Sequence, residues 1–258
     1  MDAVSPILEA RNISKSFGGV SALASVSFTA GQGTITTLVG PNGAGKTTLF
    51  NIISGVMPAD GGDIFFIGHR INSLPNYRIA RLGIARTFQH PRVFPNMTVL
   101  ENVMLITSSA NREYSYNAFQ MAFLKGEVAQ EKSRALETLD VVNLEKYRDQ
   151  FAGNLSFGSQ RLLNIAQVLA GGAELILMDE PTSGLHPEEM SKLFPILRNL
   201  VKRQKKTILL VEHDMSVVNQ LADMVYFLYD GRILVSGSPD QVLHNEKVLE
   251  AYLGKCRL

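Results

Sequence analysis

The pattern of hydrophobic and polar positions predicts paired strands at the start of the chain, followed by a buried strand. Residues 7–30 fall into short alternating segments that are broken at Gly18-Gly19. Such alternation is typical of antiparallel strands joined by tight turns. The β-branched run Thr34–Val39 then leads directly into the glycine-rich segment Gly40–Gly45. We therefore expect a hairpin-rich β region and then a strand that ends in a loop.

The segment after this loop predicts a short helix and one more strand. Thr47–Ser54 has a helical pattern, and Gly55 stands where a helix C-terminal stop is expected. Asp60-Gly61-Gly62 is typical of a turn, and Asp63–Ile67 predicts a strand.

The character of the chain changes between Pro91 and Gln167. Strand patterning almost disappears there, and charged residues follow helical spacing over Glu127–Arg148. We expect this stretch to form a mostly helical lobe that is inserted into the fold. After it, Leu175–Met178 and Thr207–Val211 are short apolar runs, typical of buried parallel strands.

A closing hairpin is predicted near the end of the chain. Val225–Leu228 and Ile233–Val235 are joined by Asp230-Gly231, a common hairpin turn. Strands and helices thus alternate along most of the sequence, which indicates the α/β fold class.

Composition excludes several classes of protein. The 258 residues are 45% apolar and 19% charged, and the net charge is +1, so no basic surplus points to nucleic acid. The single cysteine, Cys256, cannot form an internal disulfide bond, which favours a reducing compartment. The first residues lack signal-peptide features, and no apolar run approaches the roughly 20 residues of a membrane span. We expect a soluble chain without its own membrane span and without a nucleic-acid partner.

A phosphate-binding loop is predicted after the strand Thr34–Val39. Gly40–Thr47 matches G-x-x-x-x-G-K-[ST] at each fixed position, between a strand and a helix. Glycines let the backbone N–H groups curl around a phosphate, and the helix N-terminus adds partial positive charge. In this motif Lys46 reaches the β- and γ-phosphates, and the Thr47 hydroxyl ligates Mg²⁺. The expected nucleotide-binding residues are Gly40, Pro41, Asn42, Gly43, Ala44, Gly45, Lys46, Thr47 and Thr48.

Two adjacent carboxylates follow the apolar run Leu175–Met178. This run predicts a buried strand whose end presents Asp179 beside the metal, and Glu180 can then orient or deprotonate a water molecule. A second carboxylate next to the metal-binding one distinguishes a nucleotide hydrolase from a passive binding site. The alternative is an acidic helix cap before Pro181, which leaves the apolar strand unexplained.

Four further segments resemble motifs of the ATP-binding cassette (ABC) proteins. Leu155–Ser159, with the sequence LSFGS, resembles their signature motif. Ala85–Gln89 resembles the Q-loop, Ser183–Pro187 the D-loop and Val211–Asp214 the switch-histidine segment. With the phosphate loop, these elements occur in the order and spacing of the family and cover essentially the whole chain.

The resemblance implies one ABC ATPase domain over residues 1–258. Its fold is expected to be a RecA-like P-loop NTPase core with an antiparallel β subdomain, formed by residues 1–90 and 168–258. Residues 91–167 are expected to form the inserted α-helical subdomain. The implied cofactors are ATP and Mg²⁺.

The resemblance also implies a role for each motif residue. Glu180 is the expected catalytic base, while Lys46 and His213 are expected to stabilise charge on the γ-phosphate. The implied metal ligands are Thr47, Gln89 and Asp179, the last directly or through a water molecule. Gln89 also counts among the expected catalytic residues, and the aromatic ring of Phe17 is expected to lie against adenine.

Two cassettes of this family are expected to close head to tail on two ATP molecules. Ser156 and Gly158 would then reach the γ-phosphate that the partner holds, since a hydroxyl and a helix N-terminal N–H suit an anion. Phe157 and Ser159 depart from the usual signature Leu-Ser-Gly-Gly-Gln, but both γ-phosphate donors remain, so we expect the partner's site to be weakened at most. The alternative is that this half-signature is degenerate and that the two composite sites of a dimer are unequal. His186 stands where an aspartate or asparagine is typical, and its role is open.

Three segments look like the ATPase subunits of branched-chain amino acid importers and their amide and urea relatives. They are the phosphate-loop opening Gly40–Asn51, Gly83–Leu105 and the ending Val248–Gly254. The resemblance implies a second cassette, either a copy or a paralogue, and transmembrane permease subunits. It implies an extracytoplasmic solute-binding protein as an indirect partner, and a peripheral location at the cytoplasmic face of the inner membrane.

Three other functions compete with solute import. An exporter cassette for lipid or lipopolysaccharide would share every catalytic residue. A soluble cassette protein of DNA repair or translation control usually carries two cassettes, or a long coiled coil between phosphate loop and signature. The stretch between Lys46 and Leu155 leaves no room for such a coiled coil. A GTPase or small-molecule kinase is disfavoured by the signature and by the lack of an Asn-Lys-x-Asp guanine motif.

Overall fold

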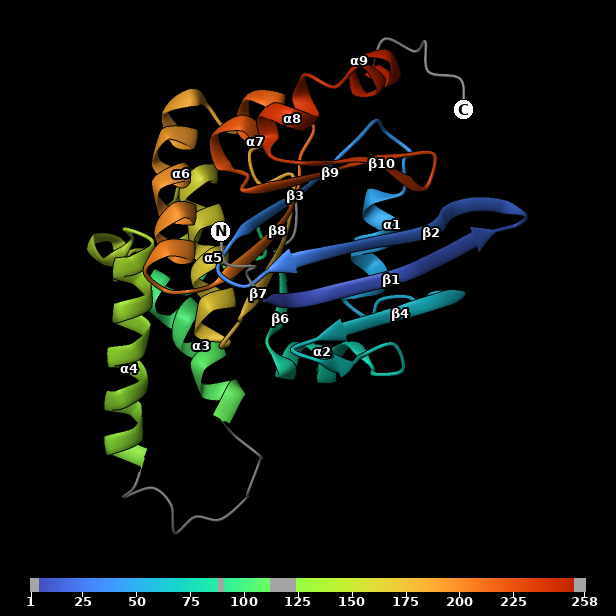
Figure 1. Ribbon diagram of the computed structural model, residues 1–258. Helices are drawn as coiled ribbons and strands as arrows, with labels where there is room; N and C mark the ends of the chain where they lie inside the picture. Colours follow the sequence, from blue (N-terminus) through green and yellow to red (C-terminus); the bar gives the residue numbers. More distant parts are fainter. Residues whose placement is uncertain (1–4, 88–90, 112–123, 253–258) are drawn as a thin grey trace. The chain divides into compact units, whose positions relative to one another are not determined.

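The protein is described by a computed structural model that covers residues 5–87, 91–111 and 124–252, without the side chains of residues 108–128 (Figure 1). It forms two compact units. The first contains Met1–Arg86, Glu174–Ser183 and Leu197–Leu258, and the second contains Thr87–Ala173 and Gly184–Ile196. The expected subdomain bounds, with a helical subdomain at 91–167, stay a prediction.

The first unit begins with a four-stranded antiparallel sheet in the order β2-β1-β4-β5. Its strands are β1 (Pro6–Phe17), β2 (Val20–Gly31), β4 (Gly61–Phe66) and β5 (His69–Arg70). The two long strands run beside each other as a hairpin (Figure 1), so the expected hairpin-rich region is confirmed.

The expected turn at Asp60-Gly61-Gly62 is wrong in its extent, because β4 already begins at Gly61. Gly62 has a φ of 87°, and a Cβ there would lie 2.4 Å from the carbonyl oxygen of Asn12. A glycine is therefore required by close approach of two strands and by backbone conformation, rather than by a turn.

A six-stranded sheet in the order β10-β9-β3-β8-β7-β6 carries the expected parallel strands. They are β3 (Ile35–Val39), β6 (Ile84–Thr87), β7 (Leu175–Asp179), β8 (Thr207–Val211), β9 (Met224–Tyr229) and β10 (Arg232–Gly237). Strand β3 pairs in parallel with β8 and β9, β7 pairs in parallel with β8, and β10 closes the sheet as an antiparallel hairpin. The carboxyl ends of β3, β7 and β8 therefore meet at one edge, where ligands bind in open α/β sheets.

The first unit is completed by α1 (Lys46–Ile53), α2 (Asn76–Leu82), α7 (Met215–Leu221), α8 (Pro239–Leu243) and α9 (Glu246–Tyr252). Buried side chains of α1 share one apolar cluster with residues of both sheets. A second cluster joins α7, α8 and α9 to β9, through residues such as Val218, Val242 and Phe227. Helix α1, which follows the phosphate loop, is thus fixed in place by packing against residues of both sheets.

The second unit is mainly helical, in agreement with the loss of strand patterning. It contains α3 (Val99–Asn111), α4 (Leu124–Val141), α5 (Phe157–Ala170) and the 3₁₀ turns Glu145–Tyr147 and Ala152–Asn154, and α6 (Pro187–Lys202) begins in it. Helix α4 ends at Val141, before the end of the charged stretch. No helix among the described residues is long and apolar enough to cross a membrane.

Candidate functional site

A pocket of about 180 Å³ lies over the phosphate loop at the edge where the parallel strands end. It is lined by Ala22, Asn42, Gly43, Gly45, Lys46, Thr47, Thr48, Glu180 and Val211. The loop runs from the end of β3 to Lys46, the first residue of α1. The pocket thus joins the helix N-terminus to the predicted catalytic carboxylate, as a site for nucleoside triphosphate requires.

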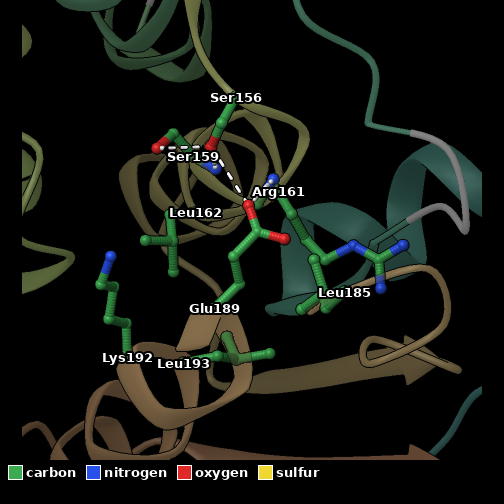
Figure 2. A pocket seen from close by; sticks show the side chains of 9 residues that line it. Ser156, Ser159, Arg161, Leu162, Leu185, Glu189, Lys192 and Leu193 are labelled. Atoms are coloured by element: carbon green, nitrogen blue, oxygen red, sulfur yellow. Dashed lines mark hydrogen bonds between the residues drawn. The ribbon is translucent and has the colours of Figure 1, made fainter. Parts of the chain in front are cut away.

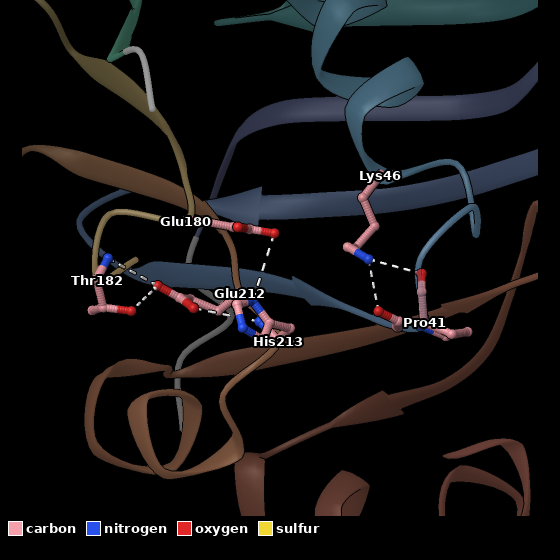
Figure 3. Close-up of polar contacts among 7 residues, drawn as sticks. Pro41, Lys46, Glu180, Thr182, Glu212 and His213 are labelled. Carbon is pink, nitrogen blue, oxygen red and sulfur yellow. Dashed lines mark hydrogen bonds and ion pairs between the residues drawn. The ribbon is translucent and has the colours of Figure 1, made fainter. Parts of the chain in front are cut away.

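Lys46 is folded back onto its own loop. Its ammonium group donates to the carbonyl oxygens of Gly40, at 2.6 Å, and of Pro41, at 2.9 Å (Figure 3). Burial lowers the pKa of Lys46, and the carboxylates of Glu180 and Asp179 oppose this shift. Lys46 is therefore a buried cation that donates two hydrogen bonds to carbonyl oxygens of its own loop.

Two loop glycines are required by packing. A Cβ on Gly40, whose φ is 150°, would clash with the carbonyl oxygen of Leu228. A Cβ on Gly45, whose φ is 106°, would lie 2.5 Å from the carbonyl oxygen of Ala22. By contrast, a Cβ on Gly43 would have no atom within 4 Å. The φ of Gly43 is 82°, a left-handed conformation. The first two glycines let the loop approach β2 and β9 closely, and the third allows a left-handed turn.

Asp179 ends β7, and its carboxylate forms an ion pair that the sequence did not reveal. Nη2 of Arg86 lies 2.9 Å from Oδ2 of Asp179, with both side chains 18% exposed. Nη1 of Arg86 donates to Oδ1 of Asn51 in α1 at 2.6 Å. Arg86 thus links β6 to the carboxyl end of β7 and to the helix that follows the phosphate loop.

Glu180 has a strained backbone at the end of the same strand. Its φ is 47°, which is unusual for a residue with a side chain, and its N–H donates to the carbonyl oxygen of Val211 in β8. Nδ1 of His213 lies 3.5 Å from Oε1 of Glu180 (Figure 3). The predicted base and the predicted switch histidine are therefore neighbours in the first unit.

Glu212 is a buried carboxyl group that the sequence analysis left without a role. It accepts hydrogen bonds from the hydroxyl of Thr182 at 2.7 Å, from the N–H of Thr182 and from the N–H of His213 (Figure 3). Burial raises the pKa of Glu212, although these hydrogen bonds oppose the shift. Glu212 holds the segment after Glu180 and the segment around His213 together, two loops that a sequence pattern cannot pair.

The remaining predicted residues are distributed as follows. Phe17 ends β1 and is 48% exposed, and Nζ of Lys15 lies 5.6 Å from the centroid of its ring. Ser156 caps α5 by accepting from the N–H of Ser159, and Gly158 lies buried in the first turn, both in the second unit. Gln89 lies outside the described residues.

The donor set is compatible with Mg²⁺ bound together with phosphates. Asp179 and the hydroxyl of Thr47 provide the oxygen ligands that this ion prefers. The described residues contain no group of three or more His, Cys, Asp or Glu side chains that could hold a metal ion by themselves. Such sparse protein ligation fits Mg²⁺, which usually binds through one or two carboxylates plus substrate phosphates.

The phenol of Tyr252 connects the end of α9 to the phosphate loop. A backbone hydrogen bond joins it to Gly40, and burial raises the pKa of this phenol to about 12. Its ring contacts Phe227 of β9, with centroids 5.6 Å apart. No local sequence pattern around Tyr252 places this residue beside the phosphate loop.

Comparison with known protein families identifies the chain. A family model described as ABC transporter matches residues 23–183, a span that runs from β2 through the phosphate loop and the signature to the D-loop. The chain belongs to the ABC transporter family. This cassette therefore binds and hydrolyses ATP and couples hydrolysis to transport, as the motifs predicted. A second model, described as branched-chain amino acid ATP-binding cassette transporter, matches residues 232–255.

Curated relatives resemble the cassette over nearly its whole length. "High-affinity branched-chain amino acid transport ATP-binding protein LivG" of Escherichia coli (strain K12) is 35% identical over 97% of this chain and 98% of its own. The BraF protein of Pseudomonas aeruginosa, with the corresponding name, has the same identity and coverage. A probable LivG of Archaeoglobus fulgidus is 38% identical over 96% of this chain and 95% of its own.

Solved structures confirm the RecA-like cassette fold. The crystal structure of the ADP conformation of MJ1267, an ATP-binding cassette of an ABC transporter, has a TM-score of 0.83 and 33% identity. It covers 97% of this chain and 99% of that one. A dimeric structure of MJ0796, a bacterial ABC transporter cassette, has a TM-score of 0.73 and 26% identity, covering 90% and 98% of the two chains.

Proposed function

We propose that the cassette powers the import of branched-chain amino acids, or of a related amide or urea solute, through separate membrane subunits. The phosphate loop and the carboxylates are shared by all cassettes and cannot discriminate between solutes. The observation that carries the substrate class is the match of residues 232–255 to a model named for branched-chain amino acid transport. Full-length relatives with the same function in their names support it.

Within one nucleotide site, the loop N–H groups and Lys46 would bind the β- and γ-phosphates, and Phe17 would lie against adenine. Glu180 would accept a proton from the attacking water as it approaches the γ-phosphorus. His213, 3.5 Å from Glu180, would donate a hydrogen bond to the γ-phosphate. The short distance between Glu180 and His213 supports their joint action on one phosphate.

Mg²⁺ would be held by Thr47, Gln89 and Asp179, the last directly or through a water molecule. When bound, this ion neutralises charge on the phosphate oxygens. Asp179 already lies at the end of β7, and its ion pair with Arg86 orients the carboxylate. Asp179 directly precedes Glu180, which lines the pocket together with Thr47, and this position supports the assignment.

A second cassette, either a copy or a paralogue, would complete each site by presenting Ser156 and Gly158 to the γ-phosphate. Transmembrane permease subunits would bind the cassette pair at the cytoplasmic face of the inner membrane, with a solute-binding protein as an indirect partner. We expect no nucleic-acid partner. The dimeric structure of the MJ0796 cassette supports the pairing.

Solute uptake in cells tests this proposal. The gene for the chain is deleted and replaced by the wild type, by Glu180→Gln or by Glu250→Gln, a control with the same isosteric change at an exposed residue of α9. We expect uptake of radiolabelled leucine, isoleucine and valine with the wild type and the control, and loss of uptake with Glu180→Gln. Unchanged uptake of all three together with loss of urea or amide uptake would select the related solutes.

Purification of the tagged chain from membranes in mild detergent tests the partners. Co-purification of two multi-span proteins and a second cassette would support an importer with paired cassettes. A single membrane protein species with no second cassette species would favour a homodimer and the exporter alternative. Soluble partners or nucleic acid alone would contradict transport.

A further inference from the structure

The carboxylate of Glu189 occupies the two hydrogen-bond donors of the signature segment. Its Oε1 accepts from the hydroxyl of Ser156 and from the N–H of Gly158, both at 3.2 Å. Figure 2 shows Glu189, in the first turn of α6, pointing at the N-terminus of α5 with Ser156 beside it. All these residues belong to the second unit. An anion from the same chain thus lies at the place proposed for a phosphate.

This carboxylate is also an ionised group. Partial burial opposes ionisation of Glu189, but hydrogen bonds from the N–H of His186, the N–H of Gly158 and the hydroxyl of Ser156 outweigh it and lower its pKa. The N-terminus of a helix further favours a negative charge. Glu189 therefore carries the charge and the acceptor oxygens that make it resemble a phosphate at this position.

The contact with Glu189 leaves no room for a Cβ on Gly158 unless the end of the Glu189 side chain shifts. A Cβ on Gly158 would lie 2.4 Å from Oε1 of Glu189 and 2.7 Å from its carboxyl carbon. Gly158 has no positive φ, so the absence of a side chain serves close approach rather than backbone conformation. The signature glycine makes room for an anion, and in this structure the anion is Glu189.

We propose that Glu189 is an internal, autoinhibitory ligand of the signature segment, which the γ-phosphate held by a partner cassette must displace before two cassettes close. The proposal rests on the proposed role of Ser156 and Gly158. One hydroxyl and one N–H each have a single hydrogen to donate, so they cannot serve Glu189 and a γ-phosphate at full strength together. Closure is thereby opposed until ATP is present on the partner.

The carboxylate of Glu189 keeps one hydrogen-bond partner after it is displaced from Ser156 and Gly158. Its Oε2 already accepts from the N–H of His186 at 3.2 Å, at the start of α6. An acidic residue in the first turn of a helix is stabilised by the helix dipole and by such a bond to the cap backbone. Release from Ser156 and Gly158 thus leaves the carboxylate with a partner, which makes the exchange reversible.

The test measures ATP-dependent pairing of the full chain by light scattering, in a Glu180→Gln background that slows hydrolysis. Glu189→Gln keeps the shape of the side chain and removes its charge. The matched control is Glu188→Gln, which removes the same charge from an exposed neighbour in the same helical turn. We expect the dimer dissociation constant to fall about tenfold with Glu189→Gln, the scale of a charged hydrogen bond, and to stay within about twofold with the control.

Adding Ser156→Ala to the Glu189→Gln variant tests whether Glu189 acts through the signature segment. We expect this addition to remove most of the gain in pairing affinity that Glu189→Gln produces. Pairing that is unchanged or weaker with Glu189→Gln, while Ser156→Ala weakens it, would overturn the inference and leave the proposed function intact. An equal gain with Glu188→Gln would also overturn it, because general charge would then be the cause. ATP binding without pairing by any variant would exclude a second copy of this chain as the partner cassette, and would overturn the inference for such a pair.

Discussion

Arg86 and Asp179 form an ion pair, with Nη2 and Oδ2 2.9 Å apart, between β6 and the end of β7. The same guanidinium bonds Asn51 in the helix after the phosphate loop. One side chain therefore connects β6, the end of β7 and α1. Because the pair is largely buried, loss of the Arg86 side chain would leave the carboxylate of Asp179 and the amide oxygen of Asn51 without this charged donor.

Replacement of Arg86 tests this connection. We expect Arg86→Ala to lower the free energy of unfolding by about 1–3 kcal/mol, the range for a buried polar group that loses its partner. Urea unfolding without nucleotide measures the change. The control, Arg78→Ala, removes the same charge from an exposed residue of α2. Equal stability of the two variants would contradict a structural role of the pair.

Glu180→Gln tests the assignment of the catalytic base. An amide cannot accept the proton of the attacking water, so we expect turnover to fall by about 10²–10⁴-fold. ATP binding should remain near that of the wild type, since Glu180 is not expected to hold the phosphates. Steady-state phosphate release and calorimetry with ATP measure the two effects. Near-normal hydrolysis by this variant would reject Glu180 as the base, and Glu250→Gln serves as control.

Lys46→Ala tests the phosphate loop. Lys46 would exchange two hydrogen bonds to loop carbonyls for charged hydrogen bonds to phosphates. We expect its loss to weaken ATP binding by about 10–100-fold, since a hydrogen bond with a charged partner contributes about 1.5–3 kcal/mol. Calorimetry measures the affinity. Lys132→Ala, at an exposed residue of α4, should bind as the wild type does. Equal affinity of both variants would exclude contact of Lys46 with the phosphates.

Glu212 predicts a pH dependence of stability. Burial raises its pKa in the folded protein above the ordinary value of 4.5. The folded state then binds more protons than the unfolded state above pH 4.5, so the contribution of Glu212 to stability is full below that value and falls as pH rises through the folded pKa. We expect wild type to lose stability relative to Glu212→Gln over this window. Urea unfolding from pH 4.5 to 8 measures the difference, and a constant difference would contradict it.

The strands of the core were predictable because each is a short apolar run bounded by turn residues. Leu175–Asp179 and Thr207–Val211 have the length and burial of parallel strands, and their neighbour β3 ends in a motif with strict spacing. The extent of β4 was not predictable in this way. Gly62 looks like a turn residue locally, and the approach of β1 makes it a strand residue.

The candidate site likewise contains residues that a local pattern predicts and contacts that no local pattern predicts. Lys46 and Glu180 stand in local patterns, so their neighbourhoods could be inferred from spacing. The contacts of Arg86 with Asp179 and of Tyr252 with Gly40 join residues far apart in the sequence. Nothing in a local pattern encodes such pairs, because they depend on strand order and on how α9 packs against β9. Buried Glu212 was likewise missed, since its partner Thr182 follows a different strand.

The loop glycines bear on how substitution data for this protein should be interpreted. Gly40 and Gly45 meet backbone carbonyls of β9 and β2, so a scan of all substitutions should find both positions intolerant even in an assay of expression or solubility alone. Gly43 faces open space, and an asparagine, which tolerates a left-handed backbone, should leave expression intact there while impairing nucleotide binding. Invariance at the first two positions among homologues would therefore reflect folding as much as ATP, and Gly43 is the position that reports on the nucleotide itself.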